Sequence, residues 1–184
     1  MADIKKLARE LAEADEGAVI LVETPIENAP EVGLEAIRAM VKRGYTGIIV
    51  SASRPYTNLV SVYAKNGIDT KKVFIIDCVT KASSVEPEEA ANVVYLDSVS
   101  DLTTMSLAIN NAMESVKGGK FIFLDSISTM LIYNRPDIFA KFVHIMLTKM
   151  RVGNVSGILI SFESENNKEV RAEIVQLCDK VIKV

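Results

Sequence analysis

Short runs of large apolar residues recur along the chain, and the stretches between them carry apolar residues at helical spacing. The run Phe121–Leu124 is one of these, and it stops at a carboxylate, Asp125. A short unbroken apolar run is typical of a strand that is buried on both faces, as in a parallel sheet. On this basis we predict seven strands, at residues 18–22, 47–50, 73–76, 93–96, 121–124, 157–162 and 180–184.

Helices are predicted between the strands, because apolar residues there recur every three or four positions. Strands that alternate with helices of about ten to fifteen residues predict a mainly parallel sheet covered on both faces. We therefore expect one three-layer α/β/α domain over residues 1–184, with a loop at 24–31 and an exposed loop at 81–89. Pro30 fits a first helical turn. Polar pairs three residues apart mark three helix starts, the first two with capping-box spacing: Asn28 and Glu31, Ser98 and Asp101, and Asn134 and Asp137.

Composition narrows the class of protein. Hydrophobic residues make up 49% of 184 residues, which indicates a packed globule, and the net charge is −3. A duplex-binding protein usually has a basic face, so nucleic acid is not an expected partner. The sequence has no apolar run near the roughly 18 residues that span a bilayer. The first 15 residues are charged throughout, unlike a signal peptide, so we expect a cytoplasmic protein.

The cysteines and the histidine are interpreted as structural residues. Cys78 and Cys178 lie beside apolar runs and far apart in sequence, which favours reduced, buried thiols over a disulfide or a metal pair. His144 falls in an apolar helical stretch with no nearby carboxylate or cysteine. We interpret it as a packed side chain rather than a catalytic one.

Carboxylates end several of the predicted strands. In a parallel sheet their side chains would share one edge, where ligands of open α/β sheets bind. They can form an acidic metal site, or they can lie there because helix N-termini favour nearby anions. Asp125 is the candidate magnesium ligand, and the alternative is that it hydrogen-bonds the neighbouring loop. The four residues are Glu23, Asp77, Asp97 and Asp125.

Further polar residues lie next to these strand ends. Arg54 precedes a helix and can bind an anion together with the helix N-terminus, or pair with a carboxylate of the same edge. Ser126 and Ser128 are expected to cap the backbone after the strand, because no sequence neighbour is placed to activate either one as a nucleophile. The turn 133–136, which begins with Tyr133, is a candidate subunit contact. The methionines of the helices are expected to fill the core.

The layout resembles the RecA-like ATPase core, which has the P-loop NTPase fold, and within it the KaiC-like group of archaeal and bacterial proteins. The resemblance covers residues 17–184 and lies in the order and spacing of several segments. Residues 17–23 are similar to the first strand of that group, and 42–51 to its second strand. Residues 66–69 and 73–78 are similar to the segments that follow. Residues 121–128, which include Asp125, look like its Walker B strand.

Two departures from this family bear on activity. Such ATPases have a glycine-rich loop ending in Gly-Lys-Ser/Thr after the first strand, whose N–H groups and lysine hold the phosphates. Here the loop 24–31 has no glycine; Pro30 stands in place of the lysine and Glu31 in place of the hydroxyl. The glutamate pair that orients the attacking water after the second strand is also missing, because the run there is Ser-Ala-Ser-Arg, ending at Arg54.

These departures predict a RecA-like domain that has lost its ATPase machinery and acts through protein contacts, either with itself or with a KaiC-like or signalling partner. No cofactor is expected on this hypothesis. The alternative is a protein that binds magnesium and ATP, or a weak ATPase, in a remnant cleft formed by Asp125, Ser126 and Arg54, with Asp125 holding the metal. A third hypothesis is a metal-dependent enzyme that uses Asp77, Asp97 and Asp125.

Overall fold

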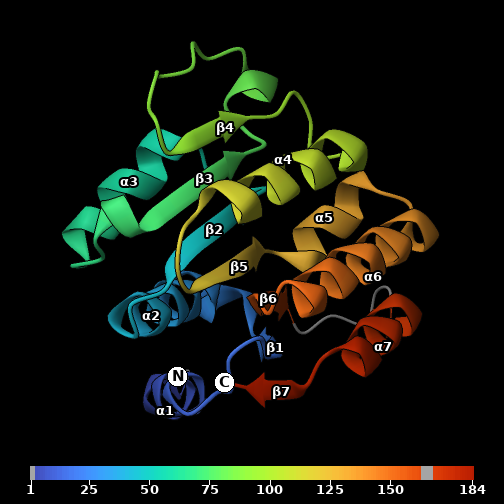
Figure 1. The fold of residues 1–184 in the computed structure, drawn as a ribbon. Helices are drawn as coiled ribbons and strands as arrows, with labels where there is room; N and C mark the ends of the chain where they lie inside the picture. The colour runs from blue at the N-terminus through green and yellow to red at the C-terminus, as the bar shows by residue number, and fades with distance from the viewer. Residues whose placement is uncertain (1–2, 163–167) are drawn as a thin grey trace.

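The protein is described by a computed structural model, over residues 3–162 and 168–184. Within these residues, seven strands form one sheet in which every neighbouring pair is parallel (Figure 1). The order across the sheet is β4-β3-β2-β5-β6-β1-β7. The predicted parallel sheet is therefore confirmed. The strands are β1 (Val19–Thr24), β2 (Thr46–Ser51), β3 (Val73–Asp77), β4 (Val93–Tyr95), β5 (Lys120–Asp125), β6 (Ser156–Phe162) and β7 (Lys180–Lys183).

Helices cover both faces of the sheet, which gives the predicted three layers (Figure 1). One face packs against α1 (Ile4–Ala12), α2 (Ala29–Lys42) and α3 (Tyr56–Lys65). The other packs against α4 (Leu102–Ser115), α5 (Ile127–Tyr133), α6 (Pro136–Val152) and α7 (Lys168–Leu177). Short 3-10 turns occupy Ile26–Asn28, Thr70–Lys72 and Lys81–Ser83. Among the described residues, no helix is both long and apolar enough to span a membrane.

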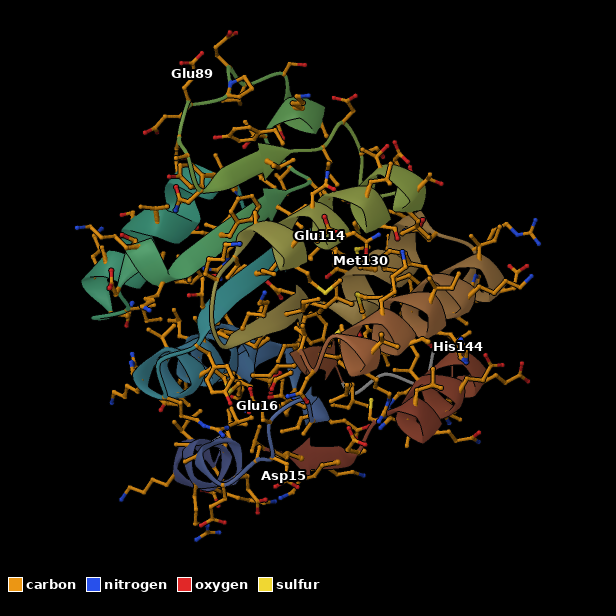
Figure 2. The ribbon with its side chains drawn as sticks, in the orientation of Figure 1. Asp15, Glu16, Glu89, Glu114, Met130 and His144 are labelled. Atoms are coloured by element: carbon orange, nitrogen blue, oxygen red, sulfur yellow. The ribbon has the colours of Figure 1, made fainter. Side chains whose placement is uncertain are left out.

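Each central strand contributes alternate side chains to two cores. On β5, Ile122 and Leu124 belong to the core under α4–α7, whereas Phe121 and Phe123 belong to the core under α1–α3. Phe121 is fully buried beside Gly47, its partner on β2. A Cβ atom at Gly47 would lie 2.7 Å from the Phe121 ring, so this position requires glycine. Met130 is also fully buried, between the sheet and the helices α4 and α6 (Figure 2), as expected for a core methionine.

Two of the predicted helix starts are wrong in detail. Asn28 precedes α2, but its backbone already has helical angles as part of the 3-10 turn, and its side chain makes no capping hydrogen bond. The cap of α4 is Asp101 rather than Ser98: its carboxylate accepts the N–H of Thr104 at 3.0 Å. Pro30 does lie in the first turn of α2, as predicted.

The third predicted start is confirmed, because α6 (Pro136–Val152) begins between Asn134 and Asp137, but a helix that the sequence pattern did not predict ends just before it. Asn134 closes α5, and its side-chain amide donates to the carbonyl oxygens of Met130 and Val99. The helix α6 begins two residues later, at Pro136. Seven residues is too short a helix to show a clear apolar period, so α5 could not be distinguished from a loop.

The histidine and one cysteine are more exposed than expected. His144 is exposed on the outer side of α6 (Figure 2), so its interpretation as a packed side chain is wrong. The helix buries Phe142, Val143 and Met146, and position 144 falls outside that stripe. Both cysteines are free, as predicted; Cys78 is buried and Cys178 is half-buried. Burial, with a smaller effect of Asp77, raises the pKa of the Cys78 thiol to about 12.

Candidate functional site

The strands β2 and β5 lie side by side at the centre of the sheet, and the chain leaves them on opposite faces. After β2 it enters α3, which packs in the α1–α3 layer; after β5 it enters α5, which packs in the other layer. Ligands of open α/β sheets bind where neighbouring connections diverge in this way, at the carboxyl ends of the strands. Here that point lies at Asp125 and at the turn that follows Ser51. Ser51 and Asp125 are partners across the two strands.

Asp125 is anchored to that turn. Its carbonyl oxygen accepts the N–H of Ala52 at 3.2 Å, and the Ser53 hydroxyl donates to its Oδ2 atom at 3.3 Å. Burial raises the pKa of the Asp125 carboxyl above its ordinary value, and the Ser53 hydrogen bond and the Arg54 charge oppose this shift. The carboxylate is thus desolvated, with only one long side-chain hydrogen bond from the described residues.

A cavity of about 320 Å³ opens next to Asp125, between α2, α3 and the end of β5. Arg54 also lines it, so the structure brings together two of the three predicted site residues. Most of the remaining wall is hydrocarbon. The lining residues are Ile26, Ala29, Pro30, Gly33, Leu34, Ile37, Ser53, Arg54, Leu59, Val62, Tyr63, Phe123, Asp125, Thr129 and Phe162.

Ser126, the third predicted site residue, is not part of the cavity lining. It is fully buried, and its hydroxyl accepts the N–H of Thr129 at 3.1 Å, which caps α5 as expected. Ser128 has another role from the one expected: its hydroxyl accepts the N–H of Phe162 at 2.9 Å and so ties α5 to the end of β6. Both hydroxyls are therefore used in holding the backbone after β5.

Tyr63 also belongs to the cavity, although the sequence analysis did not single it out as a site residue. Its side chain is 3% exposed, and none of the described residues makes a hydrogen bond to its hydroxyl. Burial, and then the charge of Asp125, raise the pKa of this tyrosine, whereas Arg54 lowers it. The hydroxyl therefore lies within electrostatic range of both charged groups. Its position in an apolar helical stripe gave no sign of this role.

The carboxylates at the strand ends do share one edge, but they do not form the hypothesised metal cluster. No group of three potential metal ligands occurs within the described part of the chain. One strand separates β3 from β5, and another separates β5 from β1, so neighbouring carboxylates on these strands are roughly 10 Å apart. The metal-dependent enzyme built on Asp77, Asp97 and Asp125 is therefore not supported by this geometry.

Each of the other three carboxylates has partners of its own. Asp77 is fully buried and accepts the N–H groups of Tyr56 and Thr80 at 2.6 and 2.9 Å. Asp97, whose side chain is 85% exposed, pairs with a lysine, Lys81. Glu23 is 2% exposed and forms ion pairs with two cations, Arg171 and Lys183. These contacts are structural, and they leave Asp125 as the carboxylate that faces the cavity.

The connection from β1 to α2 lies beside the same cavity. After Thr24 the chain makes the 3-10 turn Ile26–Asn28 and enters α2 at Ala29. Pro30 offers no N–H group in the first turn of the helix, and Glu27 and Glu31 are exposed. The part of the connection that reaches the cavity is mainly apolar, and Ile26 is 67% exposed.

A second hollow lies on the opposite face, as a groove of about 360 Å³ between α4 and α6. Three large apolar side chains on its walls are about half exposed: Leu107 at 57%, Ile138 at 49% and Ile145 at 51%. The charged residues that line it are two lysines, Lys141 and Lys149. The turn predicted as a subunit contact is also exposed, with Tyr133 at 57%.

The parallel sheet and its two helical layers define a three-layer α/β/α domain, in which the connections after β2 and β5 diverge. The chain belongs to a family of unknown function (DUF7504), whose model matches residues 17–184. None of the curated proteins matches the sequence.

Two solved structures from Pyrococcus horikoshii have a similar fold. One is the uncharacterized protein PH0321, in complex with an unknown peptide; the TM-score is 0.71 and the identity 17%, over 98% of this chain and 82% of that one. The other is the KaiC-like protein PH0186, with a TM-score of 0.65 and 13% identity, over 91% of this chain and 71% of that one. At these identities the similarity establishes the fold.

Proposed function

We propose that this domain is a non-catalytic RecA-like module that acts by binding a protein segment. The observation that carries the first half of this proposal is the connection between β1 and α2. It has no glycine, no lysine and no hydroxyl where a phosphate loop has them, and it presents Ile26, Ala29 and Pro30 to an apolar cavity. Bound phosphates would meet hydrocarbon there instead of N–H donors.

The charges around this connection also oppose phosphate binding. Glu27 and Glu31 are exposed at the start of α2. Two like charges at 4 Å repel each other by about 1 kcal/mol in water and by about 4 kcal/mol at an effective dielectric constant of 20. The favourable dipole of the helix N-terminus is typically worth about 0.3–1 kcal/mol, which is less than two such repulsions together. The balance therefore disfavours an anionic ligand at α2.

The groove between α4 and α6 supports the second half of the proposal. Exposed apolar residues around a groove are typical of a docking surface, and Lys141 and Lys149 favour a partner with acidic side chains. We assign to this groove a peptide segment that combines large apolar residues with aspartate or glutamate. The fold neighbour PH0321 was crystallised with a peptide, which is consistent with peptide binding by a domain of this fold.

A second candidate function is the binding of magnesium and ATP in the cavity. It is favoured by one observation: Asp125 and Arg54 both line the cavity at the point where the connections of β2 and β5 diverge. Asp125 would hold the metal and Arg54 a phosphate, with Ser126 contributing only through the backbone that it caps. A lone carboxylate is a weak magnesium site unless phosphate oxygens share the ion.

Thermal unfolding with millimolar magnesium–ATP distinguishes the two functions. A ligand at 100 times its Kd stabilises the folded state by about 2.7 kcal/mol, which raises the unfolding midpoint of a domain of this size by more than about 2–4 °C. The proposal predicts no shift and no release of ADP. A shift that disappears in Asp125→Ala would overturn the non-catalytic assignment.

Peptide binding is tested with a displayed random-peptide library and the immobilised domain. Enriched peptides are synthesised, and their affinities for the wild type and for two variants of α6 are measured. Ile145→Asp places a charge in the groove, whereas Val152→Asp places one on the same helix at a residue that does not line the groove and is 86% exposed. We expect acidic apolar peptides whose affinity falls at least tenfold in Ile145→Asp and is unchanged in Val152→Asp.

Other outcomes of the selection contradict the assignment. Peptides that bind Ile145→Asp as tightly as the wild type would show that the groove is not the docking surface. Basic peptides would contradict the role of the two lysines. If no peptide is enriched, and the chain shows concentration-dependent self-association that is lost in Ile145→Asp, then the groove binds a second copy of the chain instead of a peptide.

A further inference from the structure

The cavity beside Asp125 has the build of a small-molecule site. Its volume of about 320 Å³ lies at the lower end of the range for ligand pockets, and at roughly 30 Å³ for each water-sized group it has room for about ten non-hydrogen atoms. Its apolar lining includes Leu34 and Ile37 of α2, Leu59 and Val62 of α3, and Phe123 of β5. These walls suit a compact hydrocarbon body.

Two polar groups in this apolar site lack adequate partners. The Asp125 carboxylate receives a single hydrogen bond from a described side chain, that of Ser53 at 3.3 Å. The Tyr63 hydroxyl, on a side chain that is 97% buried, has no partner among the residues that the structure describes. Among the described residues, the buried side-chain atom without a hydrogen-bond partner is Arg171 Nε, so the Tyr63 hydroxyl and the Asp125 carboxylate are open to the cavity, where a bound ligand can complete their hydrogen bonds.

The charges around the cavity determine the sign of that partner. Asp125 lines it, and Glu27 and Glu31 lie in the segment whose residues Ile26 and Pro30 form part of its lining. Arg54 is the cation that lines it. The lining itself carries one carboxylate and one guanidinium, so the excess of negative charge comes from Glu27 and Glu31 beside it, and this excess favours the entry of a cation over that of an anion.

We infer that this cavity binds a primary amine with a compact hydrocarbon body. The ammonium group donates hydrogen bonds to the Asp125 carboxylate and to the hydroxyl oxygen of Tyr63, and the hydrocarbon part covers the side chains of α2 and α3. Tyr63 remains neutral, because burial raises its pKa, and can therefore accept such a bond. This amine site lies on the opposite side of the sheet from the groove between α4 and α6. Amine binding therefore does not depend on peptide binding in that groove.

Three probes of nearly equal size test the inference at pH 7. They are 2-phenylethylamine, 2-phenylethanol and phenylacetate, which present a cation, a neutral hydroxyl and an anion on the same hydrocarbon body. Binding is measured by ligand-detected NMR and by calorimetry. We expect saturable binding of the amine, at least tenfold weaker binding of the alcohol and no binding of phenylacetate.

Isosteric variants assign the contacts. Asp125→Asn is expected to weaken binding of the amine at least tenfold and to leave the affinity for the alcohol unchanged. The matched control is Asp97→Asn, at an exposed carboxylate of the same sheet edge, which is expected to leave both affinities unchanged. Tyr63→Phe is expected to weaken the amine about threefold to tenfold, whereas Tyr133→Phe, at an exposed tyrosine, has no effect. Circular dichroism verifies that each variant is folded.

Several results would overturn the inference. Equal affinity for amine and alcohol, or an amine affinity that Asp125→Asn does not change, would show that the carboxylate does not recognise the ligand. Tighter binding of phenylacetate than of the amine would show that Arg54, and not Asp125, recognises the ligand. If Asp125→Asn does not fold, Val62→Trp decides the location, because a bulky ring there fills the cavity; undiminished amine binding in that variant would place the ligand elsewhere.

Discussion

Asp77 at the end of β3 and Tyr56 at the start of α3 are joined by a hydrogen bond of 2.6 Å, from the tyrosine N–H to the carboxylate Oδ2. The residue before this helix is Pro55, whose side chain makes no capping bond, so a carboxylate from the neighbouring strand takes the place of a local cap. The same carboxylate accepts the N–H groups of Val79 and Thr80. One buried side chain therefore fixes the starts of two connections at this edge of the sheet.

We predict that Asp77→Asn destabilises the domain by about 3 kcal/mol. Hydrogen bonds to a charged group are worth about 1.5–3 kcal/mol each, and an amide cannot accept on its nitrogen side. The free energy of unfolding in urea measures the loss. Asp97→Asn is the matched control, because that side chain is exposed and its surface ion pair contributes about 0–1 kcal/mol. A change below 1 kcal/mol in Asp77→Asn would contradict this role.

A second prediction concerns Gly47, which lies opposite Phe121 in the middle of the sheet. The added methyl group of Gly47→Ala would lie 2.7 Å from the Phe121 ring and 3.0 Å from the Ile49 side chain, and neither has free space into which to move. Overpacking of this kind costs about 1–3 kcal/mol. Urea unfolding measures this loss of stability. Adding Phe121→Leu, which introduces a smaller side chain, to the Gly47→Ala variant is expected to restore part of it.

The order of elements could be predicted from the sequence because it depends on local patterns. Each central strand is a short apolar run, and each long helix carries a stripe of buried residues, as in α4 and α6. The errors lie at helix ends. Asp101, and not Ser98, caps α4, because Ser and Asp are both good N-cap residues and the pattern does not determine which one is used.

The candidate site was predicted only in part, because it depends on contacts between segments far apart in sequence. The position of Asp125 after an apolar strand predicted the edge of the sheet at which the cavity lies. The environment of that carboxylate is set by α2 and α3, more than 60 residues earlier in the chain, and by Tyr63 in particular. An inward-facing tyrosine in a helical stripe has the same sequence pattern whether its hydroxyl has a partner or not.

A third prediction concerns Arg43, which connects α2 to the end of α1. Its guanidinium donates to the carbonyl oxygens of Leu11 and Ala14 at 2.7 and 2.8 Å and lies over the ring of Tyr45. Lysine cannot make both hydrogen bonds from one planar group. We expect Arg43→Lys to reduce the free energy of unfolding by about 1–2 kcal/mol and to speed amide exchange in α1. The neighbouring change Lys42→Arg should leave both measurements unchanged.

The last prediction is a pH dependence at Asp125. Burial raises the pKa of its carboxyl in the folded protein above the ordinary value of 3.8. The folded state thus holds this proton more tightly than the unfolded state, so stability is lost as the pH rises from about 4 through the folded pKa, and the loss persists at neutral pH. Asp125→Asn removes the charge, and its unfolding midpoint at pH 7 should exceed that of the wild type by at least about 2 °C.

The difference in the free energy of unfolding between Asp125→Asn and the wild type, measured in urea from pH 3 to pH 8, separates the effect of Asp125 from that of the other carboxylates. We expect the variant's advantage to be present at pH 7 and to disappear below about pH 4, where the aspartate is protonated in both states. The residue that would bind the amine is thus also one that destabilises the empty domain, as is common for binding residues. An advantage that grows toward low pH would show that the Asp125 carboxylate is stabilised in the fold and would contradict the desolvation argument.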